Sequence, residues 1–298
     1  MEKVGSDGKI TRKKVRVVAK GFMEVWGEDY IHMYLPTLGH DTLFTCLTYT
    51  ASCNLKIHQL NAVAAYLNSD LTGGIYLHPP DGIRLTPGMV WQLRKALYGL
   101  KQAGLEWFRT LHSHIQSIGY AQSGHDPCLY ILNPKTFVLV YIDDLVFTPK
   151  LSLVRRRREI ARCYEMHDPG EAHWFLAMEI THDWTAQTIS IDQHQYIWKI
   201  ISCFELGNAH LVSTPMATNL KLPKLESPAI NQKLYQSMLG SLMYVVIGTC
   251  PNIMFAVHYL SQHSIAPGNE HLNAMKQVYC YLVGTPDLSL IFFGNQLE

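Results

Sequence analysis

Apolar and polar positions follow two different periods along this chain, and together they predict a mixture of strands and helices. Lys9–Phe22 alternates basic and apolar residues, which predicts a strand with one basic face. Longer apolar patterns predict helices at 43–53, 97–119, 151–164, 193–204 and over most of 231–285. Further strands are expected at 55–60, 174–180 and 188–191, with a hairpin at 136–148. Strands and helices in mixed order, ending in a helical region, predict an α+β architecture.

Proline and glycine residues mark the breaks between these elements. Val212–Ile230 contains Pro215, Pro223 and Pro228 and is expected to be a linker. Ser241–Leu260 is the best candidate for a membrane span, but a glycine and a Cys-Pro-Asn sequence interrupt it in the middle. Two short packed helices joined by a turn are therefore expected there, rather than a span.

Composition limits the class of protein without identifying it. With 298 residues, 48% of them hydrophobic, the chain can bury a large core in one large domain or in two to three modest ones. The formal net charge is only +1, so any surface for nucleic acid must be local. The seven cysteines include no CxxC pair and no zinc spacing, which predicts reduced thiols. The charged N-terminus lacks an apolar signal segment, so we expect an intracellular protein of the cytoplasm or nucleus, not a secreted one.

Two adjacent carboxylates stand at the tip of the predicted hairpin. They belong to Tyr141-Ile142-Asp143-Asp144, hereafter the acid turn, which lies between two apolar runs. Apolar strands hold both acids rigidly, and their mutual repulsion favours a hard divalent cation such as Mg²⁺. That layout is typical of a two-metal phosphoryl-transfer centre. The alternative is a tight turn that carries Asp only for its turn chemistry.

The order of further segments along the chain resembles the copia-type LTR-retrotransposon reverse transcriptase, a Pol polyprotein segment. The resemblance runs from about Lys9 to the C-terminus and includes the acid turn. It rests on these segments in this order: Val15–Phe22, Ile57–Leu60, Tyr66–Asn68, Leu97–Ala103, Asp126–Tyr130, Gly170–His173, Ser213–Pro215 and Leu239–Tyr244.

The resemblance implies a right-hand polymerase with an antiparallel palm sheet packed on helices. Fingers and palm would occupy 1–185, thumb and linker 186–230, and a helical connecting region 231–298, which would precede a ribonuclease H domain that is expected to be missing. The implied activity is RNA-directed DNA synthesis with two Mg²⁺ ions. The implied partners are an RNA template, a DNA primer and deoxynucleoside triphosphates, with no membrane. The sequence makes no prediction about self-association.

The resemblance also assigns roles to individual residues. Asp143 and Asp144 match the paired metal-binding acids. Tyr66 matches the aromatic gate that excludes a ribose 2′-OH, although an aromatic core residue is the alternative. Lys14, Arg16 and Lys20 would place positive charge near the triphosphate, unless they form a solvated strand face. The residues that match the loop positioning template and nucleotide are Tyr98, Gly99 and Lys101.

Two other segments carry weaker assignments. Phe175–Ile180 resembles the hairpin that grips the primer beside the palm. The run Arg155–Arg158 could meet backbone phosphate, but a solvated helix face or a nuclear-import patch is the default interpretation.

The sequence departs from the family pattern at a decisive position. Asn61 stands where the family has a metal-binding Asp, so a neutral amide replaces a carboxylate. Other departures are Gly39 for Arg, Gly104-Leu105 for Pro-Arg, Ala177 for Gly, and Cys250-Pro251-Asn252 for Arg-Pro-Asp. We expect a reverse transcriptase fold with weak or absent activity. The alternative is a non-catalytic nucleic-acid-binding protein or a decayed transposon remnant.

Overall fold

The structure is a computed structural model that describes residues 2–4, 10–13, 16–71, 73–80, 82–83, 86, 88–148, 159–160 and 162–294. Lys14 and Arg155–Arg158 therefore lie outside the described residues. The chain divides into two compact units: the first comprises Met1–Gly39 and Lys56–Glu171, and the second comprises His40–Leu55 and Ala172–Glu298. The boundaries expected at 185 and 230 stay predictions. Over the described residues, no helix combines the length and apolarity that a membrane crossing requires.

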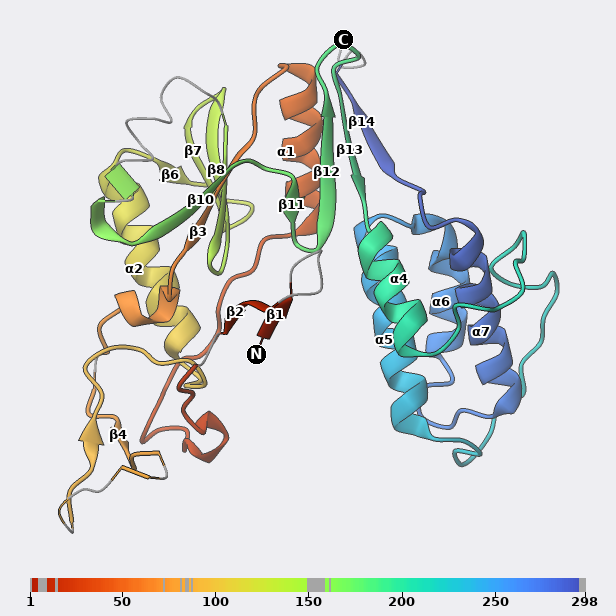
Figure 1. Cartoon of the computed structure of the whole chain (residues 1–298), viewed down its shortest axis with the longest axis horizontal. Coiled ribbons are helices and arrows are strands. Elements are labelled where there is room, and N and C mark those ends of the chain that lie inside the picture. The colour runs from red at the N-terminus through yellow and green to blue at the C-terminus, as the bar shows by residue number, and fades with distance from the viewer. Residues whose placement is uncertain are drawn as a thin grey trace. The chain divides into compact units, whose positions relative to one another are not determined.

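The first unit is built on a six-stranded antiparallel sheet (Figure 1). The strand order is β10-β3-β9-β8-β7-β6. The bounds are β3 (His58–Ala62), β6 (Ala121–Gln122), β7 (Leu129–Asn133), β8 (Thr136–Tyr141), β9 (Asp144–Phe147) and β10 (Met166–Glu171). Strands β8 and β9 form the predicted hairpin around the acid turn, which confirms that part of the sequence analysis.

Helix α2 (Ala103–Ser117) covers one face of this sheet (Figure 1). Its buried residues recur every four positions at Ala103, Trp107, Leu111 and Ile115, so they form one apolar stripe. From Trp107 to Ile115, this stripe packs in one buried core with apolar residues of β3, β8 and β9. The prediction that this helix begins at residue 97 was wrong, because Gly99 adopts a φ of +97°, which no α-helix allows.

The shorter elements of the first unit surround this core. They are β1 (Glu2–Val4), β2 (Ile10–Lys13), β4 (Tyr76–Leu77), β5 (Trp91–Gln92) and the 3₁₀ turns η1 (Gly21–Met23) and η2 (Ala65–Asn68). The strand predicted over 9–22 was wrong over 16–22, since residues 16–20 are irregular and η1 follows them. A close crossing of this segment with the loop at 97–101 replaces strand pairing there.

The second unit combines a four-stranded antiparallel sheet with helices (Figure 1). The sheet order is β11-β12-β13-β14, from β11 (Trp174–Phe175), β12 (Met178–Asp183), β13 (Thr188–Asp192) and β14 (Leu290–Phe293). The helices are α1 (His40–Ser52), α4 (His194–Cys203), α5 (Gln232–Gly248), α6 (Met254–Ser261) and α7 (Asn269–Gly284). Helices α4 to α7 share one buried core. Mixed sheet and helix in both units confirm the α+β class.

The interruption predicted between 241 and 260 lies between α5 and α6. Helix α5 ends at Gly248, and the 3₁₀ turn η3 (Pro251–Ile253) precedes α6. Proline lacks a backbone N–H and begins a new helical segment more easily than it continues an old one. Two packed helices joined by a turn are therefore confirmed.

Ala177 lies in a strained turn between β11 and β12. Leu176 and Ala177 both have φ of 52°, a left-handed conformation that costs L-residues about 1–2 kcal/mol. We expect Ala177→Gly to raise the free energy of unfolding by about 1 kcal/mol, measured by urea titration. Ala186→Gly is a matched control, because Ala186 is also exposed and lies in the next turn of the same sheet without a positive φ. That control should lose stability, and a loss for Ala177→Gly as well would contradict the prediction.

Candidate active site

Asn61, Asp143 and Asp144 come from neighbouring strands of the first unit. Asn61 lies on β3 directly opposite Asp144, the first residue of β9. Asp143 occupies the turn before β9, and its carbonyl accepts a hydrogen bond from the Ala62 N–H at 2.7 Å. Opposite residues of antiparallel strands point to the same face, so the Asn61 and Asp144 side chains are neighbours. The structure thus brings together the three positions that the sequence assigned to the catalytic centre.

The side chain of Asn61 meets Asp144 through its amide. Asn61 and Gln59 both form side-chain hydrogen bonds with the Asp144 carboxylate, and Gln59 Nε2 donates to Oδ1 at 3.4 Å. Burial raises the pKa of the Asp144 carboxyl, and these two hydrogen bonds oppose that rise. Asn61 Oδ1 is buried and has no hydrogen-bond partner within the described residues. Position 61 therefore donates to the acid pair instead of adding negative charge to it.

Tyr66 and Tyr98 form an aromatic pair beside the acids. Their ring centroids are 4.6 Å apart. The Tyr98 hydroxyl hydrogen bonds to the Asp143 carboxylate, and the Arg16 guanidinium carbon lies 5.3 Å from the Tyr98 ring centroid, within cation–π range. Burial, followed by the charge of Asp143, raises the pKa of both tyrosines, so both hydroxyls keep their proton at neutral pH. Three residues predicted to bind substrate therefore gather next to the acid turn.

Gly99 lies where two backbone segments cross. The Ala19 N–H donates to the Tyr98 carbonyl at 2.7 Å. A Cβ on Gly99 would lie 2.1 Å from the Ala19 carbonyl oxygen, and a Cβ on Gly21 would lie 1.9 Å from the Gly99 carbonyl oxygen. Only glycine fits at both positions. This crossing holds the segment that carries Arg16 against the loop that carries Tyr98.

Lys101 and Lys20 have different surroundings. Lys101 Nζ donates to the Glu24 carbonyl at 3.2 Å and to the Tyr30 hydroxyl at 3.0 Å. The Lys101 N–H also donates to Glu24 Oε2 at 2.8 Å, so this lysine ties its loop to a neighbouring segment. Lys20 is exposed. The substrate-binding roles assigned to Lys14, Lys20 and Lys101 stay predictions.

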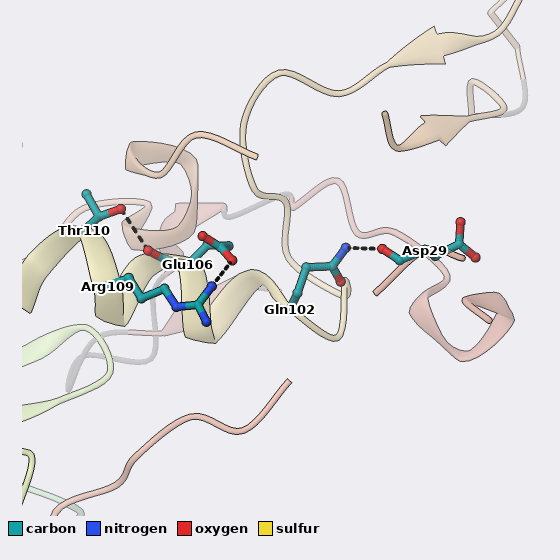
Figure 2. A network of polar contacts seen from close by, with 5 residues as sticks. All are labelled: Asp29, Gln102, Glu106, Arg109 and Thr110. Atoms are coloured by element: carbon teal, nitrogen blue, oxygen red, sulfur yellow. Dashed lines mark hydrogen bonds and ion pairs between the residues drawn. The ribbon is translucent and has the colours of Figure 1, made fainter. Parts of the chain in front are cut away.

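The start of α2 is anchored to the same neighbouring segment. Gln102 Nε2 donates to the Asp29 carbonyl at 3.3 Å (Figure 2). Figure 2 also shows the ion pair between Arg109 and Glu106 at 2.9 Å, and the Thr110 hydroxyl donating to the Glu106 carbonyl at 2.8 Å. These contacts stabilise the first turns of α2, the helix whose Trp107 side chain contacts the acid turn.

Gln59 and Trp107 contribute to the site although the sequence does not single them out. Gln59 lies two residues before Asn61, and alternate residues of a strand share a face. The sequence could therefore have predicted that Gln59 lies on the same face as Asn61. Trp107 fits the apolar stripe of α2 and is typical of a core residue. Its indole N–H nevertheless donates to the Ile142 carbonyl in the acid turn at 2.8 Å. No local pattern predicts a hydrogen bond between residues so far apart in sequence.

The acid turn offers two carboxylates as possible ligands for a divalent cation. Mg²⁺ prefers oxygen ligands and is commonly held by one or two carboxylates, which Asp143 and Asp144 supply. Position 61 supplies only an amide that directs its NH₂ group at Asp144. Within the described residues, no group of three or more His, Cys, Asp or Glu side chains could hold a metal ion. The residues therefore fit one Mg²⁺ at the acid pair better than two ions that share an acid at position 61.

The raised pKa of Asp144 predicts a pH-dependent change in stability. Folding favours the protonated form of this carboxyl, so its contribution to stability is present at low pH and is lost as the pH rises through the raised pKa. We expect Asp144→Asn to increase the free energy of unfolding at neutral pH. The difference from wild type should vanish below about pH 4, where the carboxyl is protonated in both the folded and unfolded states. Urea titrations over a pH series measure this.

Asp70→Asn is the control for that measurement. Asp70 is an exposed carboxylate of the same unit, with Lys95 Nζ at 3.4 Å, and such surface pairs contribute about 0–1 kcal/mol. A pH-dependent gain of the same size in Asp70→Asn would show that the effect does not come from burial of Asp144.

Comparison with known proteins places this geometry in context. Residues 2–218 match the family model described as reverse transcriptase (RNA-dependent DNA polymerase). The retrovirus-related Pol polyprotein from transposon TNT 1-94 of Nicotiana tabacum is 33% identical over 98% of this chain and 23% of its own length. The corresponding polyproteins from transposons RE1 and RE2 of Arabidopsis thaliana are 33% and 32% identical over 100% of this chain and 21% of their own lengths. The chain thus spans less than a quarter of each of these relatives.

Proposed function

Because this chain belongs to the reverse transcriptase (RNA-dependent DNA polymerase) family, we propose that the acid turn is the nucleotidyl-transfer centre of an RNA-directed DNA polymerase and that Asn61 impairs it. The similar Pol polyproteins confirm the resemblance to copia-type retrotransposon reverse transcriptases. The observation that carries the proposal is the position of Asn61 directly opposite Asp144 and beside Asp143. A right-hand arrangement of fingers, palm and thumb belongs to the same proposal.

The proposed reaction joins a deoxynucleotide to a primer on an RNA template. The primer 3′-OH gives up its proton to solvent and its oxygen attacks the α-phosphorus of the triphosphate in line, the bond to the bridging oxygen breaks, and pyrophosphate leaves. Mg²⁺ held by Asp143 and Asp144 would stabilise the negative charge on the reacting oxygens. These two carboxylates would hold the cation, and the strands β8 and β9 keep them at one tip.

The residues around the acids support the binding of a triphosphate. Arg16 adds positive charge next to Tyr98, where it could pair with phosphate oxygens. Tyr66, the proposed aromatic gate, packs against the Tyr98 ring, and the Tyr98 hydroxyl hydrogen bonds to Asp143. A rigid gate beside the reacting atoms is what discrimination against a ribose 2′-OH requires.

Asn61 supports the proposal that this copy is impaired. The amide removes one negative charge from a centre that must hold divalent cations, and its NH₂ group competes for Asp144. A missing metal ligand removes stabilisation that is made mainly in the transition state. The rate of nucleotide addition should therefore fall by a larger factor than the affinity for the nucleotide.

Primer extension on an RNA template with deoxynucleotides tests the proposal. The Asn61→Asp protein is expected to extend the primer, whereas the Asn61→Asp protein that also carries Asp144→Asn is expected to lose that extension. Absence of extension by Asn61→Asp would reject the polymerase proposal for this chain. Binding of primer–template that weakens steeply with salt, without extension, would instead favour the non-catalytic nucleic-acid-binding alternative.

A further inference from the structure

The acid turn contains a backbone conformation that its own sequence disfavours. Ile142 has a φ of 52°, in the left-handed region. A β-branched side chain is rare there, because its Cβ crowds the following carbonyl. Tight hairpin turns with positive φ normally use Gly, Asn or Asp. Something outside the turn must therefore hold Ile142 in this conformation.

The buried helix α2 supplies that contact. Trp107 is only 1% exposed, and its indole N–H donates to the Ile142 carbonyl at 2.8 Å. The Tyr164 ring lies edge-on to the indole, with centroids 5.2 Å apart and planes at 82°, so the indole is fixed on another side as well. A rigid donor aimed at one carbonyl sets the orientation of the Ile142–Asp143 peptide.

That peptide controls where the acids lie. The next carbonyl, that of Asp143, accepts the Ala62 N–H at 2.7 Å, and Asp144 then begins β9 opposite Asn61. A rotation of the Ile142–Asp143 peptide would move the Asp143 carboxylate relative to that of Asp144. The turn is thus held at two successive carbonyls. The Trp107 indole of α2 donates to that of Ile142, and the Ala62 N–H of β3 donates to that of Asp143.

The geometry points to Trp107 as a positioning residue that holds the acid turn in its left-handed conformation and thereby sets the relative placement of the Asp143 and Asp144 carboxylates. The hydrogen bond to the Ile142 carbonyl is the means, and Trp107 itself touches neither substrate nor cation. The contribution to catalysis rests on the proposed function, whereas the contribution to the turn does not.

Hydrogen exchange of backbone amides tests the structural claim without any assay of activity. Trp107→Phe keeps an aromatic ring in the core but removes the N–H donor. We expect the Ala62 amide, which donates to the Asp143 carbonyl, to exchange about tenfold faster or more, because a buried carbonyl loses its partner. Exchange at Ile115, a buried residue in the last turn of α2, should change much less.

Tyr235→Phe is the matched control. The buried Tyr235 hydroxyl donates to the Leu260 carbonyl at 2.8 Å in the second unit, so this variant also deletes one buried donor to a backbone carbonyl. It should leave exchange at Ala62 unchanged. Unchanged exchange at Ala62 in Trp107→Phe, or equal acceleration throughout the first unit, would overturn the proposal. If Trp107→Phe fails to fold, benzothienylalanine at position 107 alone, with sulfur in place of the N–H, preserves the ring shape and gives the same test.

A kinetic measurement then separates positioning from stability. In the Asn61→Asp protein, adding Trp107→Phe should lower kcat for primer extension about tenfold or more while KM for the deoxynucleotide changes less than about threefold, as expected for misplaced acids. Adding Tyr235→Phe should leave both constants unchanged. A rise in KM alone would assign Trp107 to nucleotide binding and overturn the positioning role. If the Asn61→Asp protein shows no extension, the polymerase proposal fails, and the exchange experiment still decides the role of Trp107.

Discussion

Asn61→Asp is expected to raise the rate of primer extension on an RNA template in Mg²⁺ by about three orders of magnitude or more over wild type. The carboxylate restores a negative charge directly opposite Asp144, on strands already in register. It also removes the NH₂ group that now donates to the Asp144 carboxylate. Both changes favour cation binding between β3 and the acid turn. Single-turnover extension of a labelled primer measures the rate of the chemical step.

Asn133→Asp is the control for this gain. Asn133 lies in the first unit at the turn between β7 and β8, where its Oδ1 accepts the Lys135 N–H at 3.0 Å, an interaction that Asp retains. The control changes one amide to a carboxylate away from the acid turn and should leave the rate at the wild-type value. Equal rates for wild type and Asn61→Asp would contradict the idea that position 61 limits activity.

Gly99→Ala is expected to destabilise the first unit by about 3 kcal/mol or more, since it combines backbone strain with a collision in a tight crossing. The φ of +97° disfavours any L side chain, and the new Cβ would lie 2.1 Å from the Ala19 carbonyl oxygen. Backbone cannot move aside as the end of a flexible side chain can. The hydrogen bond from Ala19 to the Tyr98 carbonyl should break as the segments separate. The free energy of unfolding from urea titration measures the loss.

Gly119→Ala isolates the strain from the collision. Gly119 has a φ of +98°, nearly that of Gly99, but a Cβ there would lie 3.5 Å from Leu132 Cδ1, an ordinary contact. This control should lower the free energy of unfolding by only roughly 1–2 kcal/mol, the cost of placing an L-residue in a left-handed conformation. Equal losses in the two variants would show that the crossing of backbone segments contributes nothing to stability.

The predictable part of the fold consists of elements with strong local patterns. The hairpin at 136–148 has continuous apolar strands on either side of a two-residue turn, and the helices after residue 231 have long apolar periods with clear breaks. The segment near the N-terminus was predicted less well. Its alternation of basic and apolar residues is typical of a strand, but Gly21 and Gly99 allow the two backbones to cross closely, and this contact decides the local structure.

The predictable part of the site is the set of residues with distinctive chemistry. The acid pair, Tyr66, Tyr98 and Arg16 were named from the sequence, and the structure places them together. Lys101 was also named, yet its ammonium group contacts Glu24 and Tyr30. A charged side chain has several possible partners within its reach, and the choice among them depends on segments that are distant in sequence.

By itself, the sequence determined that the chain carries paired acids in a tight turn, that its segments follow the order of copia-type reverse transcriptases, and that an amide replaces the expected acid at position 61. Each of these follows from residue identity and local order. Only the tertiary structure decided that Asn61 lies opposite Asp144 and donates to it, and that Trp107 holds the Ile142 carbonyl. Strand register and side-chain direction depend on the packing of β3, β9 and α2 against one another, which no single segment specifies alone.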